Sequence, residues 1–177
     1  AYTNTTGSEN TTIGTEAGYN NTGTGNTFLG YQAGYNQTTG SNNTVIGHDA
    51  EPSAVTVSDE ITLGDASIAT LRCQVTSITA LSDKRDKENI QPSTYGLDLV
   101  NKLKPVTYDW NTRDGAKVGV KDLGFIAQDL QEIDNENLKL VYDSNPEKLE
   151  ASYGRLIPVL VKAIQDLSAK VKELENK

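Results

Sequence analysis

The stretch NTFLGYQAGYN, Asn26–Asn36, recurs along the N-terminal part of the chain and decides how that part folds. A related stretch, NTTIGTEAGYN, precedes it at Asn10–Asn20, and NTVIGHDAEPS follows it at Asn43–Ser53. A fourth, degenerate copy, EITLGDASIAT, keeps the same glycine, so the spacing between copies is 16, 17 and 17 residues. The shared glycine falls at Gly14, Gly30, Gly47 and Gly64. A fixed period is typical of stacked repeats, in which each unit covers the apolar row of its neighbour.

Each repeat contains one short apolar pair, which predicts one short strand per repeat. The pairs are Thr12-Ile13, Phe28-Leu29, Val45-Ile46 and Thr62-Leu63. One apolar stripe in about 16 residues is thin for a solenoid built by one chain, whereas three chains wound about a shared axis would pool their stripes into a core. A single-chain β-solenoid is one alternative, and a disordered linker rich in Asn, Thr and Gly is another. The regular placement of Ile or Leu before Gly argues against disorder.

Residues 4–64 resemble the NTxIGxxAGxxxTTGSNNT repeats of bacteriophage tail fibres and of the heads of trimeric autotransporter adhesins. The resemblance implies an intertwined trimeric β-structure of the β-helix or β-prism type. We therefore expect residues 1–81 to form a β-structured fibre stalk or tip.

The composition excludes several classes of partner. The net charge of −8 and the pI of about 4.6 argue against nucleic-acid binding and against attraction to anionic membranes. No apolar run reaches the ~20 residues of a membrane-spanning helix, so no membrane insertion is expected. The sequence predicts no cofactor, no disulfide framework and no metal site, because Cys73 and His48 are the single cysteine and histidine. Three copies of His48 on a trimer axis are the one alternative for a metal or anion. The chain opens without a signal peptide, and we expect a fragment or processed product of a longer protein.

The sequence after Leu81 has the composition of a charged globular domain, and we expect residues 82–177 to form a second domain of α+β type. The dipeptide Asp114-Gly115 is the strong short-range signal for a type I′ hairpin turn. The expected elements are, in order, a short helix capped by Ser93 or Thr94, a strand over 106–111, the turn, a short helix with Leu130 and Ile133, and a strand over 138–143.

The last predicted element is a long helix over about residues 155–176, whose apolar residues follow a heptad pattern. The predicted trimer seam consists of Ile157, Leu160, Ile164, Leu167, Val171 and Leu174. Steps of three and four residues alternate strictly along this seam, which favours self-association as a coiled coil over the broader face of an isolated helix. The alternative is an amphipathic helix that packs on the core of its own domain.

The junction between the two regions carries a dense charge cluster, SDKRDKE, which begins at Ser82. From the residues alone, this pattern is typical of a solvated helix start, with Ser82 as the N-cap and acids in the first turn. The cluster and three later stretches, LKPVTYDW, GFIAQDL and YGRLIPVLVKAIQDL, are together similar to the intramolecular chaperone domain of the S74 peptidase family. The resemblance covers residues 81–177.

This chaperone domain ends phage endosialidases, tail spikes, tail fibres and neck appendages. The resemblance implies a virion component that is assembled in the host cytoplasm as a homotrimer. It implies that the whole fibre meets a host cell-surface receptor. It also implies that the domain directs trimer folding and then releases itself by a cut between Leu81 and Ser82.

The family pattern of serine, aspartate, any residue, arginine, any residue and lysine maps without gaps onto Ser82, Asp83, Arg85 and Lys87. The resemblance implies that Ser82 is the nucleophile and Lys87 its general base in a single-turnover serine-peptidase reaction, while Asp83 and Arg85 support the motif. A lysine must be neutral to act as a base, so nearby cations favour this role and nearby acids oppose it. Attack of the Ser82 hydroxyl on the Leu81 carbonyl, activation of a water and attack across chains are all open.

Two other functions are compatible with the sequence. One is a trimeric fibre tip that keeps its C-terminal domain and binds a host receptor, with Ser82 as a helix cap. The other is a bacterial trimeric surface adhesin, which the repeats alone suggest. The mass of the denatured product separates the first from a self-cleaving domain, and the sequence upstream separates the second.

Overall fold

The computed structural model describes residues 4–74 and 78–177, so residues 1–3 and 75–77 of the predicted stalk lie outside it. It has mixed α/β secondary structure with small sheets and a long C-terminal helix. The chain divides into two compact units, and the predicted boundary between residues 81 and 82 stays a prediction. The first unit combines the repeats up to Thr70 with residues 109–120 and 143–148, and the second combines residues 71–108, 121–142 and 149–177.

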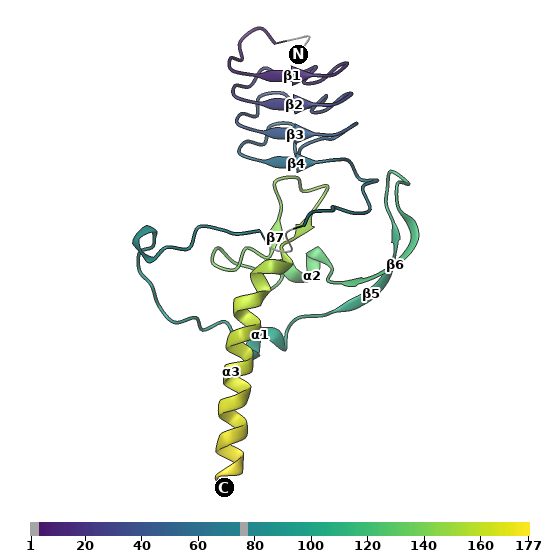
Figure 1. The fold of residues 1–177 in the computed structure, drawn as a ribbon. Helices are drawn as coiled ribbons and strands as arrows, with labels where there is room; N and C mark the ends of the chain where they lie inside the picture. The colour runs from purple at the N-terminus through teal and green to yellow at the C-terminus, as the bar shows by residue number, and fades with distance from the viewer. Residues whose placement is uncertain (1–3, 75–77) are drawn as a thin grey trace. The chain divides into compact units, whose positions relative to one another are not determined.

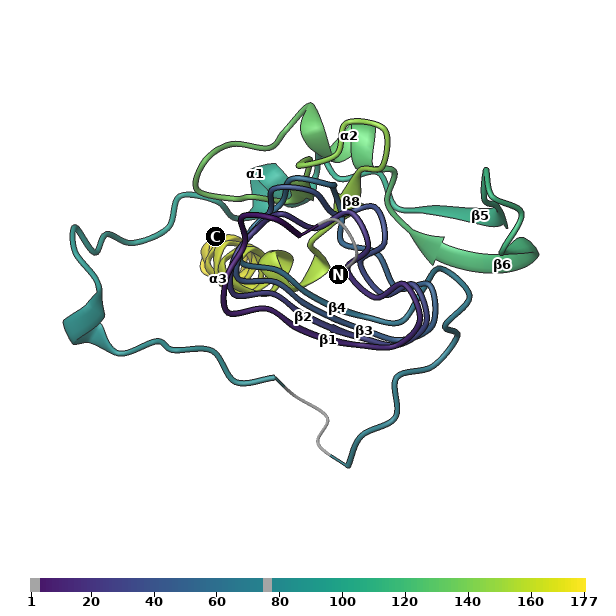
Figure 2. The same ribbon diagram turned by 90° about the horizontal axis from the view of Figure 1, so that it is seen from above.

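The repeats form four short strands that pair in parallel and in chain order. These strands are β1 (Thr11–Ile13), β2 (Thr27–Leu29), β3 (Thr44–Ile46) and β4 (Ile61–Leu63). They lie one above another in Figure 1, and successive coils overlie each other when seen from above in Figure 2. The prediction of one strand per repeat is therefore confirmed. Successive repeats pair within one chain, and the intertwining of three chains stays a prediction.

The middle residue of each strand points into the stack. Phe28 and Val45 are completely buried and pack with small residues from the turns, Ala17, Ala33 and Ala50. The last residue of each strand faces outward, so Ile13 and Leu29, which are aligned by the strand register, remain exposed. The stack thus buries one apolar column and exposes a second.

The repeated glycine is required by the backbone and by the next coil. Gly30 has a φ of +133°, a region that L-residues with a side chain rarely adopt. A Cβ atom at this position would collide with the backbone carbonyl of Gly47 in the following repeat. The glycine that recurs in the sequence therefore marks the point in each coil where the backbone closely approaches the next coil.

Buried asparagines extend the stack beyond its strands. The Oδ1 atom of Asn26 accepts a hydrogen bond from the backbone N–H of Asn43 at 2.9 Å, and its Nδ2 donates to the carbonyl of Gly40 at 2.8 Å. The same bond to the next repeat recurs on either side. Asn10 accepts from the backbone of Asn26 at 2.8 Å, and Asn43 accepts from the backbone of Glu60 at 2.9 Å. Side-chain amides thus satisfy backbone groups that a dry interior would otherwise leave unpaired.

The second unit has an aliphatic core between short elements. β7 (Val141–Tyr142) pairs with β8 (Glu150–Ala151) in antiparallel orientation. α1 (Leu97–Val100) packs on α3 (Leu156–Glu175), as Figure 1 shows, and α2 (Ala127–Gln131) contributes a buried leucine. The core consists of Leu99, Leu130, Leu138, Leu140, Leu156 and Val159. The predicted strand over 138–143 is therefore mostly a core segment, because only its middle joins a sheet.

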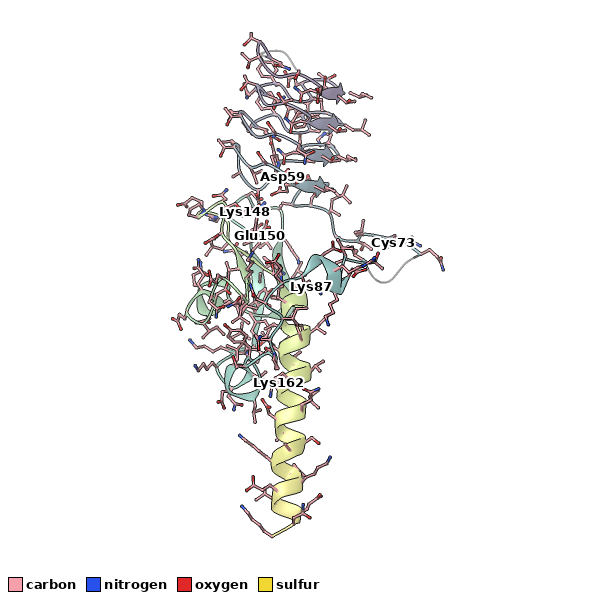
Figure 3. The ribbon with its side chains drawn as sticks, turned by 90° about the vertical axis from the view of Figure 1, so that its left-hand side faces the viewer. Asp59, Cys73, Lys87, Lys148, Glu150 and Lys162 are labelled. Atoms are coloured by element: carbon pink, nitrogen blue, oxygen red, sulfur yellow. The ribbon has the colours of Figure 1, made fainter. Side chains whose placement is uncertain are left out.

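Helix α1 is capped by a residue distant in sequence, which corrects the predicted cap at Ser93 or Thr94. Its N-cap position is Gly96, and the N–H of Leu97 donates to Oδ2 of Asp166 on α3 at 3.3 Å. A Cβ atom at Gly96 would collide with the Asp166 carboxylate, so glycine permits this close approach. Lys162, labelled in Figure 3, holds the same carboxylate from one turn earlier in α3.

The hairpin of β5 (Val106–Asn111) and β6 (Val118–Gly124) confirms the predicted strand over 106–111 but has a longer turn than predicted. Gly115 has a φ of +73°, whereas Asp114 is not in the left-handed region, so the turn is not of type I′. Instead, the Asp114 side chain accepts a hydrogen bond from the N–H of Ala116 at 2.9 Å. Local side-chain bonding of this kind competes with the tight turn.

Helix α3 coincides with the predicted helix and presents two different apolar faces. Leu156, Val159 and Ala163 are buried in the unit to which the helix belongs. The residues of the predicted seam are 44 to 68% exposed, and they are Ile157, Leu160, Ile164, Leu167, Val171 and Leu174. The helix therefore packs on its own core through residues other than those of the seam. Across the described parts of the chain, no helix combines the length and apolar character needed to cross a bilayer.

Candidate functional site

The predicted cleavage segment is an exposed stretch of chain without β-structure, interrupted by a single 3-10 turn, η1 (Lys84–Asp86). Leu81 is 82% exposed and Ser82 is also exposed, whereas Asp83 is half-buried. Lys87 follows the turn directly, and Figure 3 shows it on this segment. A protease or partner group would meet the peptide bond before Ser82 without any rearrangement of a core.

The turn is closed by Asp83 at its start and by Lys87 at its end. The Asp83 carboxylate caps the turn by accepting a hydrogen bond from the N–H of Arg85 at 2.8 Å. The N–H of Lys87 donates to the carbonyl of Lys84 at 3.2 Å. The interpretation of Ser82 as the cap is therefore wrong, because the neighbouring aspartate occupies that role.

The turn brings the predicted nucleophile and base together. Lys87 Nζ donates a hydrogen bond to Ser82 Oγ at 2.6 Å. This distance lies within the range over which a proton can be transferred directly. Both residues are exposed, so solvent reaches the pair from the surface of the chain. The contact supplies the geometry of a Ser-Lys pair, and its chemistry depends on a neutral lysine.

Asp83 and Arg85 form an ion pair beside this contact. Arg85 Nη2 lies 2.6 Å from Asp83 Oδ2, and Arg85 Nε lies 3.1 Å from Oδ1 and 3.2 Å from Oδ2. The side-chain hydrogen bond from Arg85, followed by its backbone hydrogen bond, lowers the pKa of the Asp83 carboxyl. Asp83 in turn raises the pKa of the Arg85 guanidinium. The sequence motif includes both residues, but their ion pair was not predicted. The available signal was an aspartate at a cap position two residues before an arginine.

The other candidate residues are His48 and Cys73. His48 stacks on Tyr31 with ring centroids 5.0 Å apart, and its Nδ1 lies 3.0 Å from Asp49 Oδ2. Cys73 is exposed. Among the described residues, no group of three or more His, Cys, Asp or Glu side chains is arranged to hold a metal ion.

Comparison with known proteins gives matches to one family model and to two phage proteins. Residues 82–139 match the Peptidase_S74 family model, described as the chaperone of endosialidase. The long tail fiber protein Gp37 of Enterobacteria phage K3 is 40% identical over 97 residues, which are 54% of this chain and 8% of that protein. The Gp37 protein of Enterobacteria phage T2 has the same identity over the same length, which is 7% of its chain. No solved structure matches.

The chain thus spans less than a tenth of the length of these curated relatives. The family match begins at Ser82 itself and contains the whole turn with Lys87. The resemblance predicted from the motifs is confirmed: residues 82–139 match the chaperone-of-endosialidase model of the S74 peptidase family, and 97 residues of the chain are similar to phage long tail fibre proteins.

Proposed function

We propose that this chain is part of a homotrimeric phage fibre whose C-terminal domain directs trimer folding and then releases itself by cutting between Leu81 and Ser82. The observation that carries the proposal is the 2.6 Å contact between Lys87 Nζ and Ser82 Oγ at the first residues of the family match. The fibre belongs to the virion and is assembled in the host cytoplasm. The complete fibre, far longer than this chain, meets the host receptor.

The cut proceeds in two steps that need no cofactor. Neutral Lys87 takes the proton of Ser82 Oγ, and the oxygen attacks the carbonyl carbon of Leu81. The C–N bond breaks as the Ser82 nitrogen takes up a proton, so that Leu81 is held as an ester on Ser82. Water then hydrolyses the ester and leaves a carboxylate at Leu81 and a free amine at Ser82. Direct attack by a water activated by Lys87 gives the same two ends.

Assembly is the step that makes the lysine a base. A lysine has an ordinary pKa of about 10.4, and burial or nearby cations must lower it before it accepts a proton near neutral pH. Ser82 and Lys87 are exposed in the single chain, so their desolvation has to come from neighbouring copies. Cleavage coupled to assembly in this way releases the domain only from trimers.

The exposed seam of α3 supports the trimer. Its apolar residues face solvent, whereas the neighbouring face of the helix, with Leu156, Val159 and Ala163, is buried in the same unit. Contiguous exposed apolar surface of this kind marks an association site, and strict heptad spacing favours a coiled coil. The outward column of the repeats, which includes Ile13 and Leu29, offers a second surface for association.

Intact-mass measurement of the denatured protein tests the proposal. Wild type is expected to give two pieces, the second with Ser82 as its new N-terminus, whereas Ser82→Ala and Lys87→Ala remain whole. Lys84→Ala is the matched control, because it removes a lysine from the same turn without touching Ser82, and it is expected to be cut. A wild type that stays whole while trimeric would instead identify a permanent fibre tip. Cutting in the Ser82→Ala variant would exclude Ser82 as the nucleophile.

A further inference from the structure

The ion pair between Asp83 and Arg85 lies inside the turn that carries Ser82 and Lys87, yet the cleavage steps do not use it. Three side-chain contacts of 3.2 Å or less join the two groups, although both belong to an exposed segment. Exposed ion pairs contribute little to the stability of a fold. The Asp83–Arg85 ion pair on this exposed loop therefore affects the conformation of the turn rather than the stability of the whole fold.

We infer that Asp83 and Arg85 are positioning residues for the cut: they hold the turn that brings Lys87 to Ser82, and Arg85 keeps the Asp83 carboxylate from pairing with the Lys87 ammonium. The inference rests on the proposed function, because it concerns the same peptide bond. It assigns a chemical task to two motif residues that touch neither the scissile carbonyl nor the leaving nitrogen.

The turn is needed because the reacting side chains are five positions apart. An extended chain would separate the Cα atoms of Ser82 and Lys87 by roughly 16 Å, which exceeds the roughly 6 Å reach of a lysine side chain. The cap that Asp83 provides folds this segment into one 3-10 turn, and Lys87 closes the turn through its own N–H. Both members of the pair are thus fixed to the same short piece of backbone.

Arg85 also decides which charge Lys87 meets. Its guanidinium contacts both oxygens of the Asp83 carboxylate, and this hydrogen bonding is the largest cause of the lowered pKa of that carboxyl. Without Arg85, an anion directly next to Ser82 would be free to pair with the Lys87 ammonium. A nearby opposite charge favours the charged form of a lysine, so the ammonium gives up its proton less readily. A base that stays protonated to higher pH cuts more slowly at a given pH.

The remaining charged residues near Lys87 in the sequence belong to its own segment. They are Lys84, Asp86 and Glu88, and all three side chains are exposed. Residues 78–90 are exposed apart from Asp83, so none of the helices and strands that the structure describes buries Lys87. Loss of either neighbouring cation removes one positive charge, but only loss of Arg85 also releases the Asp83 carboxylate.

The test measures the rate of self-cleavage against pH. Full-length chains are recovered uncut in denaturant and refolded by dilution over about pH 6 to 10, and the cut fraction is followed by denaturing gel and mass. In Arg85→Gln, the rise of the rate with pH is expected to move upward by about one unit, so that cutting below it is about tenfold slower. In the double variant Asp83→Asn/Arg85→Gln, the rise is expected to return to its wild-type position, because asparagine caps the turn without a charge.

Lys84→Gln is the matched control, since it removes a neighbouring cation and leaves the Asp83–Arg85 pair intact. Its profile is expected to move by less than half of the shift in Arg85→Gln. An equal shift, or a double variant as slow as Arg85→Gln, would overturn the positioning role. An unchanged pH profile in Arg85→Gln would also overturn the positioning role. If Ser82→Ala and Lys87→Ala stay whole in the same experiment, the proposed cut itself is still supported. Cutting at Ser82 in Lys87→Ala would refute the proposed function itself. Circular dichroism and the oligomer mass show that each variant folds.

Discussion

In the repeats, four amide side chains are buried, Asn21, Asn26, Gln37 and Asn43, whereas the core of the second unit consists of leucine and valine. The repeat core holds two large apolar residues, Phe28 and Val45, and otherwise only alanines. A stack of coils with so little apolar area depends on saturating its backbone hydrogen bonds from one coil to the next. The second unit instead brings together elements from distant parts of the sequence by apolar packing.

The two units are therefore expected to lose stability by different routes. In a linear stack each coil contacts only its neighbours, so a substitution destabilises the altered coil and the coils directly next to it. In the second unit the core is shared, and damage reaches α1, α2 and α3 together. Both units nevertheless expose an apolar row, and the largest predicted effect concerns the row on α3.

Ile164→Asp is expected to convert the proposed trimer into single chains. Ile164 is 67% exposed in one chain and lies in the middle of the predicted seam. Three aspartates facing one another at a coiled-coil core would be desolvated without partners. Light scattering coupled to gel filtration gives the mass of the assembly.

Gln165→Asp is the control for this substitution, because the same charge is introduced one position away, at an exposed residue outside the seam. It is expected to remain trimeric. A trimer of unchanged mass in Ile164→Asp would show that the exposed row of α3 does not mediate association.

Phe28→Ala and Leu140→Ala test the separation of the two cores. Phe28 is completely buried, and its ring is fitted against Gly18 and Gly34, where any Cβ atom would collide with it. Its loss is expected to cost about 3 to 5 kcal/mol, and the loss of the Leu140 side chain about 2 to 5 kcal/mol. Hydrogen exchange should show lost protection in the strands of the repeats for Phe28→Ala, and around β7 and α3 for Leu140→Ala. Loss of protection in both units from either variant would contradict independent cores.

Asn26→Ala tests the dependence of the repeats on buried amides. The substitution leaves the N–H of Asn43 buried without its acceptor, whereas the carbonyl of Gly40 keeps one donor, the side-chain amide of Gln37. The expected cost is about 1 to 3 kcal/mol in the free energy of unfolding of the repeats, measured by denaturant titration. Thr38→Ala is the control, because its exposed hydroxyl also donates to the next coil, at 3.1 Å to Val55, but stays accessible to water. Equal losses would show that burial of the amide is not what matters.

The sequence predicts the repeats better than the second unit because the repeat signal is local. The glycine period and the apolar pairs place every strand of the repeats. The period is visible in the sequence because a Cβ at a position such as Gly30 would collide with the next coil. The cap of α1 was predicted wrongly because the real acceptor, Asp166, lies 69 positions from Leu97. No local pattern at Ser93 contains that information.

The candidate site was predicted through the family resemblance rather than through the residues. On local rules Ser82 is a helix cap, but Asp83 caps the turn and Ser82 meets Lys87. Aspartate has the advantage of a charge, since it binds both the N–H and the guanidinium of Arg85. The contact between Ser82 and Lys87 depends on this turn and so cannot be deduced from the spacing of the two residues alone.

The smallest predicted effect is an opposite response of the two units to acid. Burial raises the pKa of Glu51 in the repeats, although hydrogen bonds from Asn36 oppose it. The hydrogen bond from Lys162, followed by that from the N–H of Leu97, lowers the pKa of Asp166 at the junction of α1 and α3. A raised carboxyl pKa means that the folded state binds the proton first, and a lowered one means that the unfolded state does.

As pH falls through the raised pKa of Glu51 towards its ordinary value near 4.5, the repeats gain stability. The contribution of Asp166 is present above its ordinary value near 3.8 and is lost as pH falls through the lowered pKa, so the junction of α1 and α3 weakens in stronger acid. Hydrogen exchange of each unit at several pH values separates the two responses. Glu51→Gln should remove the first and Asp166→Asn the second, each without altering the other. If both units respond to acid with the same sign in these variants, the response comes from the net charge of the chain rather than from these two carboxylates.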